Sequence, residues 1–244
     1  MTENGIRLYI ELPRRSRSAV IKDRDSIANL LIAAMSAHGY QPQPNTPARW
    51  GFGVVARSLG GVQPGQRLWA VERVVVGSSD PALIPILRAI EPRDLVEPNA
   101  IPGAGVDLRT AVIRVASPWP PVEAAGFYCV SPIRVTDRTA PDSGASYLET
   151  GPRLDELLNQ TMQARFGRPF ELRLIPDSLY VRSRHGNISA GMGIKTRANG
   201  KPVVIRGLLL PFVLVGSPQD IGAAWYSGLG RSTARGFGCL EMGQ

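Results

Sequence analysis

The order of the predicted strands and helices limits the possible folds more than any other feature of this sequence. In the first half, apolar alternation and helical spacing predict strand, helix, strand, strand, helix and strand. These segments are residues 6–13, 25–40, 50–59, 67–77, 79–90 and 110–118. We expect Asp25 or Ser26 to cap the first helix, Gly39 to end it, and Ser79 or Asp80 to cap the second. A β-α-β-β-α-β order is that of the split-βαβ, ferredoxin-like unit.

The second half repeats this order with longer connections between the elements. The predicted segments are strands at 125–137, 202–216 and 235–242, helices at 146–167 and 217–230, and a strand pair or one bent strand over 170–184. Residues 185–201 are rich in glycine and basic residues, which predicts hairpin tips. The proline-rich segment Pro118–Glu123 predicts a stiff linker. We therefore expect an α+β fold of two ferredoxin-like domains, residues 1–120 and 121–244.

The charge of the chain points to a polyanionic partner. Lys and Arg number 28 against 20 Asp and Glu, which gives a formal net charge of +8. All but Lys22, Lys195 and Lys201 of these cations are arginines, whose planar fork suits phosphate oxygens and stacks on bases. A GC-rich genome also favours arginine codons over lysine codons, but codon usage does not account for the net charge. The excess of positive charge therefore favours nucleic-acid binding.

Several classes of protein are disfavoured by composition. With Cys129, Cys239 and only two histidines, the chain lacks the ligand spacing of a zinc site, and both cysteines are expected to be free, buried thiols. We expect neither a metal nor another cofactor. The N-terminus lacks the pattern of a secretory signal, and no apolar run reaches the roughly 18 residues that span a membrane. A soluble, cytoplasmic protein without a membrane partner is the expectation.

The stretch "GLGRSTARGFGCL" near the C-terminus is the most specific motif. Glycines at these positions permit backbone with positive φ and are expected to let the chain approach a ligand, while the amides form an anion nest. The surrounding order does not match a P-loop or a dinucleotide-binding fingerprint, because both of those open a helix. The residues expected to contact an anion are Gly228, Gly230, Arg231, Ser232, Arg235, Gly236 and Gly238.

This motif resembles the glycine-rich loop of the repeat-associated RNA-binding proteins of CRISPR systems, known as the RAMP superfamily. "FYCVSPIRV" is similar to the strand that opens the second domain of these proteins, and residues 205–242 are similar to their closing strand, helix, loop and strand. Such a loop at the end of a tandem ferredoxin-like chain resembles the endoribonucleases that process CRISPR repeat RNA. A member from a type IV system is one possibility.

The resemblance implies cleavage of CRISPR repeat RNA without a metal, by attack of a ribose 2′-OH on the adjacent phosphate. The products would be a 2′,3′-cyclic phosphate and a 5′-OH, with the enzyme still bound to the crRNA stem-loop. The alternative is a non-catalytic RNA-binding subunit of a CRISPR ribonucleoprotein complex, which needs only the loop and a basic surface.

The resemblance also suggests candidate residues. The general base of the family often lies at the end of the first helix, where His38 stands, with Tyr40 two residues on and Arg24 within reach if the preceding loop folds back. His38 as a simple helix-capping residue, and catalysis by arginine and tyrosine alone, both stay open. Further contacts with the RNA backbone are expected from a basic hairpin carrying Arg182, Arg184, His185, Lys195 and Arg197.

Overall fold

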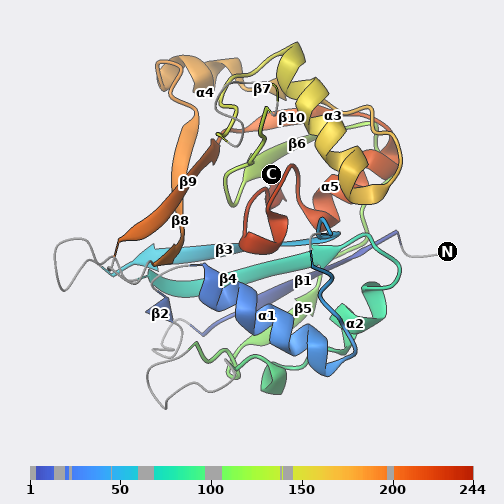
Figure 1. Ribbon diagram of the computed structural model, residues 1–244, viewed down its shortest axis with the longest axis vertical. Helices are drawn as coiled ribbons and strands as arrows, with labels where there is room; N and C mark the ends of the chain where they lie inside the picture. The colour runs from blue at the N-terminus through green and yellow to red at the C-terminus, as the bar shows by residue number, and fades with distance from the viewer. Residues whose placement is uncertain are drawn as a thin grey trace.

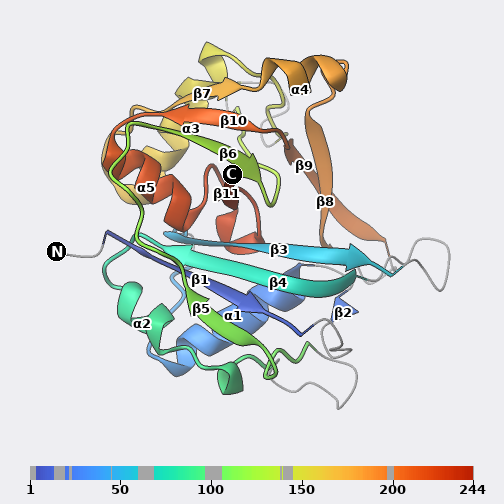
Figure 2. The ribbon, with the colours of Figure 1, turned by 180° about the vertical axis from the view of Figure 1, so that it is seen from behind.

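The computed structural model shows two antiparallel sheets with the C-terminal segment between them. The structure describes residues 4–13, 20–21, 24–44, 46–59, 69–96, 106–137, 139, 145–196 and 201–243. In Figure 1 the N-terminal sheet lies below and the C-terminal sheet above, and the red C-terminal segment lies against β3 between them. Figure 2 shows the same two sheets from behind.

The N-terminal sheet has the strand order of a ferredoxin-like unit. It contains β1 (Ile6–Glu11), β3 (Trp50–Ser58), β4 (Trp69–Ser78) and β5 (Val112–Val115). They lie in the order β3-β4-β1-β5 with all neighbours antiparallel, and the short β2 (Val20–Ile21) also pairs with β4. The predicted β-α-β-β-α-β order is confirmed, and β2 is an additional short strand between β1 and the first helix.

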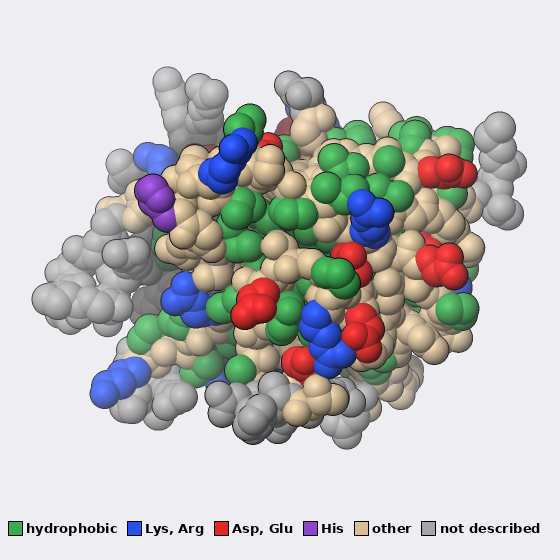
Figure 3. Space-filling model, turned by 90° about the horizontal axis from the view of Figure 1, so that it is seen from above, with side chains coloured by type: hydrophobic (Ala, Val, Ile, Leu, Met, Phe, Trp, Pro, Cys, Tyr) green, Lys and Arg blue, Asp and Glu red, His purple; other side chains and the backbone are tan. Residues whose placement is uncertain are grey.

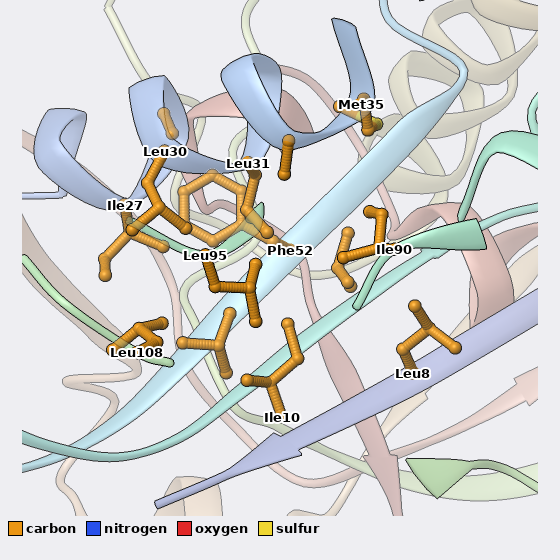
Figure 4. Close-up of a cluster of buried hydrophobic side chains, with 14 of the residues drawn as sticks. Leu8, Ile10, Ile27, Leu30, Leu31, Met35, Phe52, Ile90, Leu95 and Leu108 are labelled. Carbon is orange, nitrogen blue, oxygen red and sulfur yellow. The ribbon is translucent and has the colours of Figure 1, made fainter. Parts of the chain in front are cut away.

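Two helices cover one face of this sheet and enclose its core. Helix α1 (Asp25–Ala37) places Ile27, Leu30, Leu31 and Met35 toward the strands, and α2 (Ile84–Ala89) and the 3-10 turn η1 (Pro92–Asp94) follow β4. Figure 4 shows these side chains packed against residues of β1 and β3 and against the segments around η1. The spacing of the apolar residues was therefore a correct guide to the buried face of α1.

Helix starts were less predictable than helix faces. The residue before α1 is Arg24, which makes no capping hydrogen bond, so the expected cap by Asp25 or Ser26 is wrong; Asp25 is already in the first turn. Helix α2 begins only at Ile84, because residues 81–83 form a turn in which Asp80 accepts from the Ala82 amide at 3.0 Å. Gly39 follows α1 with φ of 94°, as expected for a glycine that ends a helix.

The C-terminal sheet repeats the same strand order. Its strands are β6 (Ala124–Cys129), β7 (Arg173–Pro176), β10 (Phe212–Val215) and β11 (Leu240–Met242), arranged β11-β6-β10-β7. The helices are α3 (Pro152–Phe166), which ends at Gly167 in a left-handed conformation, and α5 (Pro218–Ser227), which Ser217 caps through the Asp220 amide at 3.1 Å. The tandem ferredoxin-like fold is therefore confirmed.

An insertion between β7 and β10 corrects two predictions. Residues 178–184 were expected to be a strand, but they form α4 (Ser178–Ser183), since the Asp177 carboxylate accepts from the amides of Leu179 and Tyr180. The predicted long strand 202–216 is two strands, β9 (Pro202–Leu208) and β10, separated around Pro211. A proline has no N–H to continue a strand ladder. β9 pairs with β8 (Ser189–Thr196), which takes up most of the expected hairpin tip.

The two sheets are joined by residues 116–123. The backbone of the C-terminal half also packs directly against strands of the N-terminal sheet. A Cβ atom on Gly51 would lie 2.5 Å from the Ser227 carbonyl oxygen, and one on Gly77 would lie 2.5 Å from the Tyr226 carbonyl oxygen. These strand glycines let the two backbones touch. The division of the chain into residues 1–120 and 121–244 stays a prediction. Among the described residues, none of the helices is long and apolar enough to cross a membrane.

Candidate nucleic-acid interface

The glycine-rich loop, residues 228–238, connects α5 to β11 and contains the 3-10 turn η2 (Thr233–Arg235). Its four glycines all have positive φ, between 65° and 87°, and Ser232 has φ of 60°. Left-handed backbone of this kind is costly for residues with a Cβ, so glycine at these positions is required by conformation. The expected turn geometry of the motif is confirmed.

The space left by the missing Cβ atoms is filled by the protein itself. A Cβ on Gly238 would lie 1.9 Å from the Leu229 carbonyl oxygen, and one on Gly230 would lie 2.5 Å from the Arg134 carbonyl oxygen. At Gly236 the neighbours are the Phe52 ring at 3.1 Å and Arg24 Cδ at 3.3 Å. The expectation that these glycines make room for a ligand is corrected: they make room for protein atoms.

Much of the loop backbone is also bonded internally. The Leu229 amide donates to the Gly238 carbonyl, the Arg231 amide to the Arg134 carbonyl, and the Gly238 amide to the Pro132 carbonyl, each at 2.8 Å. These amides are therefore not the anion nest that the sequence suggested. These three amides are taken, and the charged groups of the loop that can meet an anion are the side chains of Arg231 and Arg235.

Three guanidinium groups lie close together on this loop and the adjacent strand segment. Arg231 Nη1 donates to Thr136 Oγ1 at 2.5 Å, and Arg134 Nη1 donates to Ser232 Oγ at 2.9 Å. Burial lowers the pKa of Arg134, and the positive charges of Arg231 and Arg235 lower it further. Like charges placed together in this way attract a polyanion. Arg134 was not among the predicted site residues, because its place in "SPIRV" looked like an ordinary strand.

A groove of about 600 Å³ opens beside this cluster. One wall is α3, another is the loop from Arg231 to Arg235, and the remaining walls are residues 46–48 with Thr136, Asp137 and Thr139. Arg153 also lines the groove and donates to Asp137 at 2.7 Å and to Glu156 at 2.6 Å. Hydrogen bonds from Thr139 and Arg153 lower the pKa of Asp137 to about 2, so this carboxylate is ionised and paired with Arg153.

Arg165 of α3 holds the loop from beneath. Its side chain is 5% exposed and donates to the carbonyl oxygens of Ser227 at 2.8 Å, Gly228 at 2.7 Å and Gly230 at 3.1 Å. A fourth bond, 3.0 Å long, reaches the Ala48 carbonyl in the N-terminal half. Burial lowers the pKa of Arg165 to about 9, which leaves it protonated at neutral pH. The structure therefore makes this arginine part of the protein core.

His38 follows α1 and forms an ion pair within the N-terminal half. Its Nε2 lies 2.9 Å from Asp94 Oδ2 in η1. Burial alone would raise the pKa of Asp94, but the hydrogen bonds from His38 and from the Glu91 amide outweigh it and lower the pKa. An ionised Asp94 accepts a hydrogen bond from Nε2–H of His38, which leaves Nδ1 as the acceptor of the ring in its neutral form.

Tyr40 is linked to the glycine-rich loop through Trp50, and Arg24 is not near His38. The Trp50 indole N–H donates to the Tyr40 hydroxyl at 3.1 Å, and the Trp50 carbonyl accepts from Thr233 Oγ1 at 2.7 Å. Arg24 and His38 flank opposite ends of the 13-residue helix α1, which is about 20 Å long. The loop before α1 therefore does not bring Arg24 to His38; Arg24 instead packs beneath Gly236, where burial lowers its pKa to about 10.

The predicted basic hairpin is divided between two elements. Arg182 lies on α4, Arg184 ends it, and His185 follows with φ of 49°; all three are exposed. Lys195 is exposed on β8, and Arg197 lies outside the described residues. In Figure 3 the His side chain and several Lys and Arg side chains lie toward the α4 side of the upper face, whereas on the α3 side Asp and Glu side chains are interspersed with Lys or Arg. The insertion therefore presents a basic surface.

The two cysteines are free thiols, as expected, with Cys239 buried and Cys129 partly buried. Burial raises the pKa of the Cys129 thiol to about 12, which keeps it protonated. Within the described ranges, no three His, Cys, Asp or Glu side chains gather in the manner of a metal site.

Comparisons with known proteins agree with this arrangement. No curated protein sequence is detectably similar to the chain. Among solved structures, a Cas6-related protein from Pyrococcus furiosus has a TM-score of 0.69 at 15% identity, with 98% of this chain and 99% of that chain covered. A RAMP protein that binds different RNA substrates has a TM-score of 0.64 at 14% identity, covering 98% and 100%. A Cas6 product complex has a TM-score of 0.53 at 14% identity, covering 98% and 99%. At these identities the likeness shows a common fold.

The family model for the C-terminal part of the CRISPR-associated protein Cas6 matches residues 119–242. The match covers just over half of the 244 residues and includes α3, the insertion, α5, the glycine-rich loop and β11. The chain therefore belongs to the Cas6 family of CRISPR-associated proteins.

Proposed function

We propose that this Cas6 protein is a metal-independent endoribonuclease that cleaves CRISPR repeat RNA and stays bound to the product stem-loop. The observation that carries the proposal is the cluster of Arg134, Arg231 and Arg235 on a glycine-rich loop of the Cas6 pattern. One solved structure of similar fold is a Cas6 bound to its product, and another is a RAMP protein that binds RNA. Both support RNA as the polyanion that this cluster binds.

In the proposed reaction, His38 removes the proton from the ribose 2′-OH. Asp94 lies 2.9 Å from Nε2 of His38, which leaves Nδ1 as the nitrogen that acts as the base. The freed 2′-oxygen attacks the adjacent phosphorus, the bond from phosphorus to the 5′-oxygen breaks, and that oxygen takes a proton from solvent water. Tyr40, Arg231 and Arg235 are the proposed partners of the phosphate oxygens, since positive charge placed where the phosphorane forms lowers the barrier.

A second candidate function is RNA binding without cleavage, as a subunit of a larger ribonucleoprotein. One observation favours it: Arg24 and His38 lie a helix length apart, so the three residues first proposed for catalysis do not form one site. The glycine-rich loop and the basic insertion suffice for this role.

Cleavage of the host's repeat RNA by the purified protein in EDTA separates the two candidates. We expect cutting at one position, and we expect a 2′-deoxyribose at that position to block it. Cutting of the 2′-deoxy RNA would contradict attack by the 2′-OH. Binding of the RNA without any cutting would support the subunit instead.

The two histidines of the chain provide a matched pair of variants. Asparagine cannot act as a base, it can still bond to Asp94, and it tolerates the positive φ at position 185. We expect His38→Asn to slow cleavage by about a hundredfold or more, and His185→Asn to leave the cleavage rate unchanged. Equal rates for the two variants would leave catalysis to arginine and tyrosine and would contradict the role of His38.

A further inference from the structure

We propose that the groove between α3 and the glycine-rich loop holds one unpaired nucleotide of the bound RNA, next to the stem. This inference rests on the proposed RNA-binding function and adds a site for a single base, which the arginine cluster alone does not provide. The groove is distinct from the His38–Asp94 pair, because its lining comes from α3, from residues 46–48, 136–137 and 139, and from the loop between Arg231 and Arg235.

The groove has the size and polarity of a nucleotide site. Its volume of about 600 Å³ lies in the range that accepts a ligand as large as a nucleoside monophosphate. Arg231 and Arg235 line the loop side of the groove, while Asp137 and Glu156 line it together with Arg153, the ion-pair partner of both. Because Arg153 offsets these two carboxylates, the loop guanidinium groups are the place in the groove that attracts a phosphate.

The α3 wall offers a base both an apolar surface and a hydrogen-bond acceptor. Leu157 and Ala164 line the groove and provide surface for the face of a ring. Gln160 also lines it, and its Nε2 donates to Glu156 Oε1 at 3.0 Å. That bond fixes the amide so that its carbonyl oxygen is left to accept. We therefore expect a base with an exocyclic amino group to bind better than uracil.

The bound nucleotide must come from a single-stranded part of the RNA. Bases within an A-form stem present their edges in a deep, narrow groove, whereas an unpaired base can turn outward into a pocket. A stem bound against the exposed basic insertion leaves its unpaired flank to reach the loop. The groove would then contribute selectivity for RNA that carries a flank.

The test compares two variants of α3 that differ only in position. Gln160 and Gln163 are both exposed, but only Gln160 lines the groove. Gln160→Trp fills the groove, and Gln163→Trp adds the same side chain beside it. Affinity is measured for three forms of the host's repeat RNA, each with a 2′-deoxyribose at the cut site: the flanked repeat, the bare stem-loop, and flanked repeats with one abasic position at a time.

For the unaltered protein, we expect one abasic position, and uracil at that position, to weaken binding of the flanked repeat by about tenfold. Gln160→Trp should weaken binding of the flanked repeat to the same extent, leave the bare stem-loop unaffected, and abolish the effect of the abasic position. Gln163→Trp should behave as the unaltered protein. Equal affinities of the two variants for the flanked repeat, or an equal loss for the bare stem-loop, would overturn the nucleotide site. Failure of the unaltered protein to bind any repeat RNA would overturn the proposed function itself.

Discussion

The two halves of the molecule share one strand order and differ in their connections. The N-terminal sheet, β3-β4-β1-β5, and the C-terminal sheet, β11-β6-β10-β7, are arranged alike. The C-terminal half adds the insertion α4–β8–β9 after β7 and the glycine-rich loop after α5. The N-terminal half instead supplies two strand glycines, Gly51 of β3 and Gly77 of β4, at which the backbone of the other half comes close. The two sheets therefore form a common scaffold, whereas the candidate RNA-binding residues lie in the segments that connect the elements of the C-terminal half.

Two buried arginines cross between the halves in opposite directions. Arg7 of β1 donates to the carbonyl oxygens of Trp225, at 2.5 Å, and Leu240, and its guanidinium lies 3.7 Å from the centre of the Trp225 ring. Arg165 of α3 reaches the Ala48 carbonyl of the N-terminal half while holding the glycine-rich loop. On burial these carbonyl oxygens lose the hydrogen bonds that water donated to them. Each guanidinium group donates hydrogen bonds in place of that water. At the contact between the halves, these two arginines therefore supply the hydrogen-bond donors for buried backbone carbonyl groups.

Removal of Arg165 should break this contact and have the largest effect. In Arg165→Met the apolar chain remains, but the carbonyls of Ala48, Ser227, Gly228 and Gly230 lose their donor. Unpaired buried acceptors cost about 1–3 kcal/mol each before relaxation, so we expect the free energy of unfolding to fall by about 4 kcal/mol. Urea unfolding measures the change. Arg182→Met, on the exposed surface of α4, is the control and should change stability by less than about 0.5 kcal/mol.

A small effect of Arg165→Met would mean that solvent reaches these carbonyls, and the arginine would then not be required for the loop. A folded variant also provides a second measurement. If Arg165 positions the loop, affinity for repeat RNA should fall while affinity for a nonspecific duplex is kept.

A pair of strand glycines, one from each sheet, tests the difference between the halves directly. On Gly51 of β3 a Cβ would lie 2.5 Å from the Ser227 carbonyl oxygen, whereas on Gly126 of β6 it would meet nothing within 4 Å. We expect Gly51→Ala to reduce the free energy of unfolding by about 3 kcal/mol, because backbone atoms must move apart. Gly126→Ala should be neutral or stabilise by up to about 1 kcal/mol, since alanine restricts the unfolded chain. Similar values for both variants would show that the N-terminal sheet does not require glycine for this contact.

Sequence patterns predicted what is local in each half. Apolar periodicity located α1 and the four main strands of the N-terminal sheet, and the helix predicted over 217–230 correctly places the start of α5 at Pro218. The main local error was α4, where "SLYVRSR" looked like a strand although Asp177 immediately before it is a strong cap. For this segment, the capping residue Asp177 was better evidence of a helix than the apolar residues were of a strand.

The site could be predicted only where its residues are close in sequence. The glycine-rich loop is one continuous motif, so its turn was evident. Arg165 lies more than 60 positions from the loop carbonyls that it holds, and Asp94 lies 56 positions from His38. Which residues meet across such sequence separations depends on how the two sheets pack against each other. The spacing of apolar residues along the chain carries no information about that packing. The roles of the loop glycines were misread for the same reason, because their neighbours come from distant segments.

The separate contributions of the glycine-rich loop and the insertion to RNA binding should appear in how the RNA affinity changes with salt concentration. Arg235, on the loop, and Arg182, on α4, are both exposed. If each contacts one phosphate, Arg235→Gln and Arg182→Gln should each weaken RNA binding by several-fold. Each should also reduce the slope of log affinity against log salt by about 1. Only Arg235→Gln should, in addition, slow cleavage. An unchanged salt slope for Arg235→Gln would place the RNA away from the loop.

The smallest effect is expected from a contact that stays within the N-terminal half, the ion pair of His38 and Asp94. The pKa of Asp94 is lowered in the folded protein, so its contribution to stability is present above the unfolded-state pKa of about 3.9 and is lost as pH falls further. A partly exposed pair of this kind contributes about 0.5 kcal/mol, which is about 2 °C in Tm for a chain of this size. We expect Asp94→Asn to lower Tm by that amount at pH 6 and by less near pH 3, where Asp94 is more protonated. In a His38→Ala background, which lacks the bond to Asp94, the same substitution should lose most of its effect at pH 6. A constant difference in Tm at both pH values would mean that Asp94 stabilises η1 through its bond to the Glu91 amide and not through its charge.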